Sequence, residues 1–273
     1  MAHYIGSRLD SRMMFLGLGW VVFIQLGSQF FSAYFDVPGD LYTLNRKLIS
    51  EGFHALEPQD LRRAIAFLAG SLSLTLAASL SVVLWSEGSL SPAVVIILLF
   101  VFMGTILSSF PPVRLVTTGY GELMNSVLFA NLVPALAFLL QNEEMHRLVT
   151  LTTTPLFPLY LGMLLVYELT DYTNDLRQDK RTLMVRLGWR NGMRLHNGLV
   201  LAGFILLGVS LLAGLPVRIG GPVYFVLPLG LVQIWQMRRI TEGSKPQWMM
   251  LTLNSVALLM TTVYLLAYGY WVR

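Results

Sequence analysis

The chain contains no cysteine and few charged residues. Without cysteine it can form neither disulfide bonds nor thiolate–metal sites. The absence of cysteine says nothing about the cellular compartment of the protein. Only 12% of its 273 residues are charged, whereas 55% are hydrophobic, and the mean hydropathy is +0.63. A soluble protein of this length needs far more charged surface. The shortage of charge therefore excludes an ordinary soluble domain.

Long apolar stretches take the place of the missing charge. Each is close to the roughly 20 residues that cross about 30 Å of hydrocarbon. We therefore predict an all-α polytopic membrane bundle that forms a single transmembrane helical domain over residues 1–273. Prolines inside the predicted helices are tolerated in membrane proteins, and here they are Pro134, Pro155, Pro158 and Pro228. The eight predicted spans lie near 13–34, 63–85, 91–109, 119–141, 148–170, 193–214, 220–236 and 247–271.

The basic residues are sorted by side of the membrane. Fourteen of the 19 Lys and Arg residues fall on the side of two segments, 34–62 and 171–192, and five fall on the other side. Because positive loops stay inside, these two motif loops are predicted to face the cytoplasm, with both termini outside. We expect a bacterial or archaeal cell membrane, with the lipid bilayer as a partner. The chain has a net charge of +4, but because its basic residues are sorted by side of the membrane, nucleic acid is not an expected partner.

Charge is concentrated in one stretch, "YELTDYTNDLRQDKRTLMVRLG", at residues 167–188. Asp171 and Asp175 are four residues apart, so they share one face if the fifth helix continues through them. The segment "FDVPGD" gives Asp36 and Asp40 the same spacing. Both pairs fall at predicted cytoplasmic helix ends, and basic residues follow each pair.

Paired carboxylates with basic neighbours favour a particular chemistry. Two facing pairs would bring four negative charges together, which is costly unless a cation intervenes. Mg²⁺ binds a few carboxylates and completes its octahedron with water and phosphate oxygens, and Lys and Arg suit the remaining diphosphate oxygens. The residues therefore predict a Mg²⁺–diphosphate site at the mouth of the bundle. Either pair taken alone is also consistent with an ordinary charged loop.

Three segments resemble the UbiA superfamily of intramembrane prenyltransferases. "DYTNDLRQDKRTLMVRLG" is similar to its second signature and "YFDVPGDLYTLNRKLISEG" to its first. "FPPVRLVTTGYGEL" is similar to a segment between them that ends in Gly-x-Gly-Glu-Leu. The matching positions are Asp36, Asp40, Asn45, Arg46, Leu48, Ser50, Gly52, Pro112, Arg114, Leu115, Gly119, Gly121, Glu122, Leu123, Asp171, Asp175, Lys180, Arg181, Thr182, Leu183, Val185, Arg186, Leu187 and Gly188.

The resemblance implies a Mg²⁺-dependent transferase. Such an enzyme moves an isoprenyl group from an isoprenyl diphosphate to an aromatic acceptor, here a quinone precursor such as a dihydroxynaphthoate. The resemblance gives the catalytic and metal-binding roles to Asp36, Asp40, Asp171 and Asp175. The substrate-binding residues that it implies are Ser32, Asn45, Arg46, Arg114, Lys180 and Arg181.

Three departures from the family pattern keep an alternative open. Ser32 and Ala33 stand where the first signature has Asn-Asp, and Pro38-Gly39 interrupts the spacing of Asp36 and Asp40. The family has nine helices, so the first one is expected to be missing. The alternative is a noncatalytic UbiA-like subunit or scaffold that binds partner subunits of a membrane complex. A transporter fits the number of spans, but the sequence has no inverted repeat.

Overall fold

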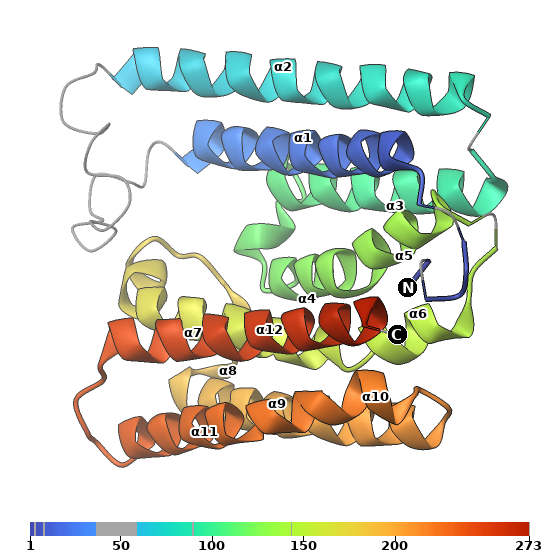
Figure 1. The fold of residues 1–273 in the computed structure, drawn as a ribbon. Helices are drawn as coiled ribbons and strands as arrows, with labels where there is room; N and C mark the ends of the chain where they lie inside the picture. The colour runs from blue at the N-terminus through green and yellow to red at the C-terminus, as the bar shows by residue number, and fades with distance from the viewer. Residues whose placement is uncertain (3, 8, 37–58, 89, 143, 273) are drawn as a thin grey trace.

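The protein is helical throughout the part of the chain that the structure describes (Figure 1). This computed structural model describes residues 1–2, 4–7, 9–36, 59–88, 90–142 and 144–272, without the side chains of 36, 59 and 60. The helical elements are α1 (Ser11–Asp36), α2 (Gln59–Ser86), α3 (Pro92–Ser109), η2 (Leu115–Thr117), α4 (Gly121–Val127), η3 (Leu128–Leu132), α5 (Val133–Leu139), α6 (Arg147–Thr153), α7 (Leu156–Arg177), α8 (Leu183–Leu187), α9 (Trp189–Leu212), α10 (Val217–Gly220), η4 (Gly221–Val226), α11 (Leu227–Thr241) and α12 (Trp248–Trp271).

Within the described residues, eight stretches of helix are long and apolar enough to cross a membrane, which confirms the predicted all-α, eight-span architecture. Their ends agree with the prediction to within a few residues, except that the fifth span continues to Arg177. The segment expected to be a loop from residue 171 therefore begins as the last turns of α7. The spans are α1, α2, α3, α4–η3–α5, α6–α7, α9, α10–η4–α11 and α12.

Successive spans alternate in direction (Figure 1). We call the end where α1, α7 and α11 finish, at Asp36, Arg177 and Thr241, the motif end. The opposite end, where α1 begins at Ser11 and α12 finishes at Trp271, is the termini end. Asp36 at the end of α1 and the pair Asp171 and Asp175 near the end of α7 therefore lie at the motif end. The eight predicted spans, alternating in direction, led to the same expectation.

The spans pack in two groups. In the first group α1 packs on α2 and α3, and in the second α7 packs on α9 and α12. Separate clusters of buried apolar side chains hold them, one around Trp20 and Leu136, the other around Leu165 and Met237. The α4–η3–α5 span contacts both groups, through α3 and α1 on one side and α7 on the other. At the junction of α4 and α7, the segment that precedes α4 lies against the segment that follows α7.

Prolines mark the breaks inside the compound spans. Pro155 separates α6 from α7, Pro134 lies in the first turn of α5 after the π-helical η3, and Pro228 lies in the first turn of α11 after the 3₁₀-helical η4. Proline lacks the N–H that continues an α-helix, but its fixed φ suits a first turn. The prolines predicted to lie inside helices therefore divide spans into segments without ending them.

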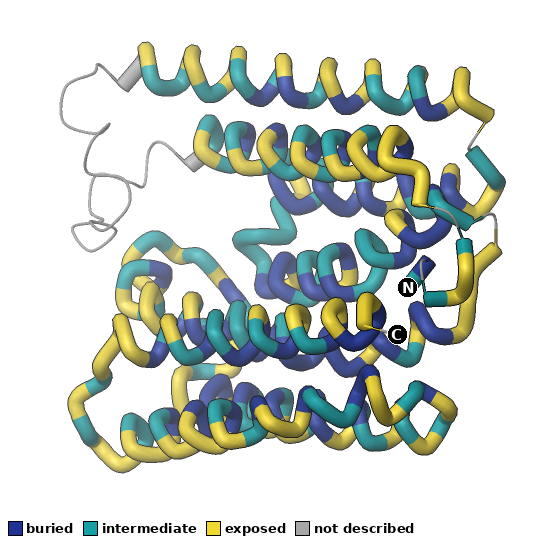
Figure 2. The backbone as a smooth tube through the Cα atoms, viewed as in Figure 1, coloured by how far each residue is buried: buried dark blue, intermediate teal, exposed yellow. Residues whose placement is uncertain are grey.

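The outer faces of the helices are exposed (Figure 2), and they carry many large apolar side chains. Leu212 is 92% exposed, Phe225 86% and Trp85 77%. An apolar surface of this extent would aggregate in water, whereas hydrocarbon solvates it. The buried faces of the helices form the core and the exposed faces suit lipid.

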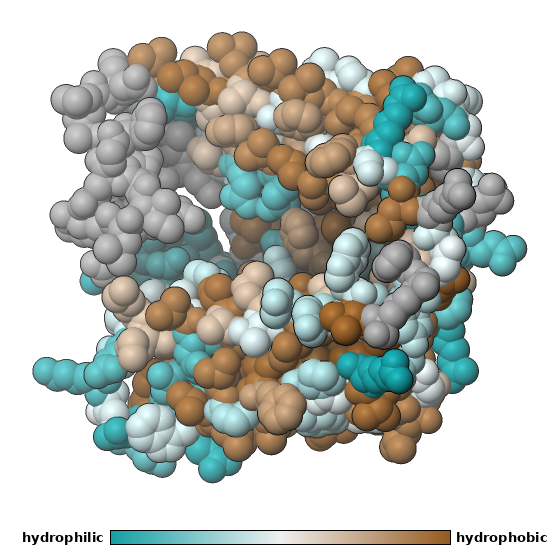
Figure 3. Space-filling view, viewed as in Figure 1, coloured by the Kyte–Doolittle hydropathy of each residue, from teal (hydrophilic) through white to brown (hydrophobic). Residues whose placement is uncertain are grey.

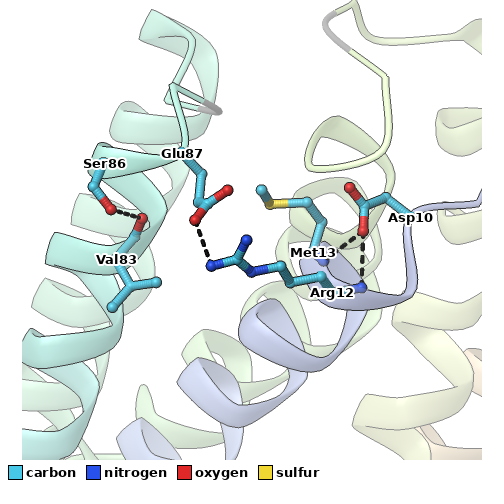
Figure 4. Close-up of polar contacts among 6 residues, drawn as sticks. All are labelled: Asp10, Arg12, Met13, Val83, Ser86 and Glu87. Carbon is cyan, nitrogen blue, oxygen red and sulfur yellow. Dashed lines mark hydrogen bonds and ion pairs between the residues drawn. The ribbon is translucent and has the colours of Figure 1, made fainter.

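Two polar contacts fix the beginning of α1 (Figure 4). The Asp10 carboxylate accepts hydrogen bonds from the backbone N–H groups of Arg12 (2.8 Å) and Met13 (3.2 Å), which caps the helix. The Arg12 guanidinium lies 2.7 Å from the Glu87 carboxylate beyond the end of α2. The Arg12 side chain is 66% exposed, so solvent screens this ion pair and the cap contributes more to stability.

The alternation of spans places Glu144, between α5 and α6, on the opposite side of the membrane from Glu242, between α11 and α12. Because the chain has no native cysteine, Glu144→Cys and Glu242→Cys each present a single thiol. With the motif end in the cytoplasm, an impermeant maleimide added to intact cells labels only Glu144→Cys. Labelling of both thiols from outside would contradict the alternation, and labelling of Glu242→Cys alone would reverse the orientation.

Candidate functional site

The second aspartate pair lies on the last turns of α7. Asp171 is exposed and Asp175 is 7% exposed, one turn further along the helix. Because α7 continues through both residues, the i, i+4 spacing places them on one face, as predicted. A helix holds the two carboxyl groups in a fixed relation, which a flexible loop would not.

The chain reverses direction immediately after α7. The Lys180 N–H donates to the carbonyl of Asp175 (3.0 Å), and Asp179 has a φ of +52°, in the left-handed region. This arrangement is a Schellman cap, which usually has glycine at the left-handed position. Aspartate tolerates this conformation better than most residues that have a side chain. The cap brings Lys180 back beside the end of the helix that carries Asp175.

The segment after the cap docks on the segment between α3 and α4. The Arg181 N–H donates to the carbonyl of Thr117 (3.0 Å). Gly119 has a φ of +78°, and a Cβ there would lie 2.8 Å from the Arg181 carbonyl oxygen and 2.8 Å from Arg186 Cδ. The Arg186 guanidinium lies 4.9 Å from the centre of the Tyr120 ring, a cation–π contact. The two signature segments therefore touch along their backbones.

Glu122 joins the same two segments. It is 6% exposed, lies in the first turn of α4, and its Oε1 accepts a hydrogen bond from the Leu183 N–H (3.1 Å). A carboxylate in the first turn of a helix can compensate the helix dipole. Here Glu122 also positions the second signature, because Leu183 begins α8 two residues after Arg181.

Acidic side chains from α4 and α7 gather below the aspartate pair. Glu168 precedes Asp171 by one turn and lies within electrostatic range of Glu122, Asp171 and Asp175. Among the residues that the structure describes, Glu122 Oε2 is buried without a hydrogen-bond partner, whereas the Glu168 carboxyl group lies beside the Thr182 hydroxyl. Buried polar atoms need a proton, water or a cation. This region is therefore built to receive a positively charged or hydrogen-bonding group.

The predicted residues of the first signature are described only in part. Ser32 lies on α1 and its hydroxyl donates to the Ser109 hydroxyl of α3 (3.2 Å). Arg114, with a φ of +35°, places its guanidinium 6.0 Å from the centre of the Phe35 ring on α1. The side chain of Asp36, together with Asp40, Asn45 and Arg46, lies outside the described residues. The meeting of the two aspartate pairs therefore stays a prediction.

The described residues fit one half of a magnesium site. Within them, no three His, Asp or Glu side chains are grouped as metal ligands. Mg²⁺, however, usually takes one or two carboxylates and fills its other positions with water and substrate phosphate oxygens. The pair of Asp171 and Asp175, held on α7 next to the buried carboxyl groups of Glu122 and Glu168, has the donor chemistry for such an ion.

Comparison with known proteins identifies the family. Residues 1–256 match the UbiA prenyltransferase family. The chain belongs to this family. It is therefore a UbiA-family membrane prenyltransferase, a transferase of prenyl groups, as the three signatures predicted. A search of the curated proteins found no match.

A solved structure has the same fold as this UbiA-family chain. It is described as that of a digeranylgeranylglyceryl phosphate synthase in membranes. The two chains share 12% sequence identity with a TM-score of 0.62, over 96% of this chain and 86% of the other. At this identity the similarity establishes the UbiA-like fold alone.

Sequence reasoning missed the docking of the two segments as a structural unit. Gly119 and Arg186 were recognised as matching the family pattern, but neither had a role. A signal was present: a Gly-x-Gly segment needs a partner that approaches the backbone closely. Only the structure identifies that partner as residues 181–186, in a segment far along the chain.

Gly119→Ala is expected to destabilise the docking. The added methyl group would lie 2.8 Å from the Arg181 carbonyl oxygen, and the alanine would have to adopt the left-handed φ of +78°. Gly88→Ala is the matched control, because Gly88 has a φ of +71° with nothing within 4 Å of its Cβ and lies outside the signature segments. The left-handed conformation costs each variant about 1–2 kcal/mol, and the collision should cost Gly119→Ala about 1–3 kcal/mol more. Equal losses of stability on thermal unfolding in detergent would show that the close contact is unimportant.

Glu122→Ala is expected to lower the stability by about 1–3 kcal/mol, because the Leu183 N–H loses its acceptor. Glu122→Gln keeps an acceptor oxygen and removes the charge, so it should lose less. Thermal unfolding in detergent measures both, with the exposed Glu144→Ala as a control. If Glu122→Gln unfolds as early as Glu122→Ala, the charge of Glu122 matters more than this hydrogen bond.

Proposed function

We propose that the chain is an active, Mg²⁺-dependent prenyltransferase that joins the prenyl group of an allylic diphosphate to an aromatic acceptor, a quinone precursor. One observation carries this proposal: Asp171 and Asp175 are held on a rigid helix, and the cap and docking at residues 117–122 position the Lys180–Arg181 segment beside them. A charged segment without a function would not need two backbone contacts and a buried glutamate to hold it.

The proposed roles follow from charge. Asp171 and Asp175, with Asp36 and Asp40 from the first signature, would hold Mg²⁺. Their negative charges repel a free diphosphate, so the donor binds only together with the cation. When bound, Mg²⁺ stabilises the negative charge that collects on the diphosphate as the allylic C–O bond breaks.

Basic residues would bind the departing diphosphate. Lys180 and Arg181 follow the aspartate pair directly, and Arg114 lies on the segment that docks against them. Arg46 and Asn45 of the first signature, with Ser32, complete the proposed set. Donors placed before the reaction stabilise the leaving group without reorganisation, which lowers the barrier to ionisation.

The carbon chemistry would take place toward the bundle interior. The C–O bond of the donor breaks, the allylic carbon forms a C–C bond with the acceptor ring, and the ring then loses a proton. Apolar walls keep water from the cation. The orientation predicted from the basic residues would admit both substrates from the cytoplasmic side.

Two classes of acceptor are distinguished by assay. A dihydroxynaphthoate tests the aromatic acceptor, which the second signature favours. The name of the structurally similar synthase points to a glyceryl phosphate lipid for that protein. Turnover with the lipid and none with the aromatic compound would replace the proposed acceptor and keep the prenyl transfer.

The alternative function is a noncatalytic subunit of a membrane complex. The replacement of Asn-Asp by Ser32 and Ala33 favours it, and the Ser32 hydroxyl is already engaged with Ser109. The partners of such a subunit would be other membrane proteins. Failure to bind a prenyl diphosphate in the presence of Mg²⁺ would favour this alternative.

Asp175→Asn tests the proposed site directly. Removing one metal-binding charge should lower prenyl transfer from geranylgeranyl diphosphate at least as much as the ~10–100-fold cost of losing a supporting residue. Removal of Mg²⁺ by EDTA should abolish transfer. Asp179→Asn is the matched control, since Asp179 is exposed and asparagine tolerates its left-handed backbone. Equal activity of the two variants would remove Asp175 from the site.

A further inference from the structure

Four exposed arginines lie at the motif end of α9 and α11, apart from the aspartate pair. Arg190 and Arg194 are one turn apart at the start of α9, and Arg238 and Arg239 lie in the last turn of α11. Within the described residues none of the four forms an ion pair with a carboxylate. Figure 3 shows hydrophilic side chains around the motif end of α11, at the lower left. We call these four residues the basic surface.

The two helix ends that carry the basic surface lie side by side. α9 begins at the motif end, α11 finishes there, and the two helices pack on each other. The Thr241 hydroxyl of α11 lies 3.7 Å from Met193 Sδ of α9, and Met193 and Met237 belong to one buried apolar cluster. Because Met193 directly precedes Arg194 and Met237 directly precedes Arg238, the contact brings the two pairs of arginines together.

Each pair continues the lipid-facing side of its helix. On α9 the exposed residues that follow Arg194 at helical spacing are Gly198, Leu201 and Ile205. On α11 the exposed residues before Arg238 are Leu231 and Trp235. The arginines therefore lie where the apolar faces end, at the level of the lipid head groups.

Two of the arginines stack on tryptophan rings. The Arg190 guanidinium lies 5.1 Å from the centre of the Trp189 ring, and the Arg239 guanidinium lies 5.0 Å from the centre of the Trp235 ring. Tryptophan is enriched at the membrane–water interface. A cation–π contact orients a guanidinium group and leaves its N–H donors available for a phosphate. An ordinary positive loop needs only charge, whereas these side chains are also held in position.

Gly198 leaves open space beside the basic surface. It lies one turn from Arg194 in the interior of α9, where glycine weakens a helix relative to alanine. A Cβ at Gly198 would meet nothing within 4 Å. Packing within the protein therefore does not require glycine here. Glycine does allow another molecule to approach the backbone closely.

We propose that the basic surface binds an anionic phospholipid of the leaflet at the motif end. The lipid phosphate lies among the four arginines, and the first methylene groups of the lipid lie over Gly198. The predicted orientation places this end in the cytoplasmic leaflet, whose surface carries anionic lipids. A zwitterionic head group brings a cation of its own, which the arginines repel, so an acidic head group binds more tightly.

The test measures lipid binding without turnover, so it does not depend on the proposed function. The double variant Arg194→Gln/Arg239→Gln removes two of the four cations. Arg147→Gln/Arg218→Gln is the matched control, because these two arginines are also exposed and lie at the termini end, at the starts of α6 and α10. Each protein in nonionic detergent is titrated with phosphatidylglycerol, with phosphatidylcholine of the same acyl chains and with inorganic phosphate, and the Tm is measured.

Phosphatidylglycerol should raise the Tm of the unaltered chain at a lower concentration than phosphatidylcholine does. The concentration that gives half of the shift should rise about 30-fold in Arg194→Gln/Arg239→Gln, roughly fivefold for each arginine, and stay unchanged in the control. Gly198→Leu keeps every charge and should raise this concentration about fourfold, as for the loss of one buried methylene group.

Three results overturn the inference. The first is an equal response of the unaltered chain to the two lipids. The second is an unchanged half-shift concentration in the double arginine variant or in Gly198→Leu, or an equal rise in the control. The third is a full shift with inorganic phosphate alone, which would assign the arginines to a free anion.

Discussion

The hydrogen bond between the Glu122 carboxylate and the Leu183 N–H holds the motif end together. It links α4 to α8, and with the Arg181–Thr117 backbone contact it fixes the segment that carries Lys180 and Arg181. Gly119 makes this possible because no side chain separates the two backbones. The fold brings α4 against α7, and this contact turns that packing into a defined arrangement of charges.

The sequence predicted the architecture well, because the signals for it are local. Length and hydropathy predicted eight spans, and the direction of each span placed both aspartate segments at one end. The spacing of Asp171 and Asp175 predicted a shared face, which α7 provides. The three signatures predicted the UbiA family, which the family match over residues 1–256 confirms. These conclusions depend on patterns that lie within a few turns of chain.

The sequence could not predict contacts between distant segments. Nothing local shows that Gly119 faces Arg181, or that Glu122 accepts a hydrogen bond from Leu183, because each depends on how α4 and α7 pack. The limited contact between α1 and α12 likewise depends on packing between distant segments, since α1 packs on α2 and α3 whereas α12 packs on α7 and α11. The part of Asp36 and Asp40 in the site stays a sequence-based prediction, since the Asp36 side chain and Asp40 lie outside the described residues.

The partners in the Glu122–Leu183 bond are 61 residues apart in the chain. During synthesis on the ribosome, Glu122 emerges well before its partner, and the whole α6–α7 span is made in between. Until Leu183 has been made, Glu122 Oε1 lacks the backbone N–H from which it later accepts a hydrogen bond. Folding at this end can therefore finish only after the fifth span has been made, so a chain cut before residue 183 has five spans and lacks this hydrogen bond.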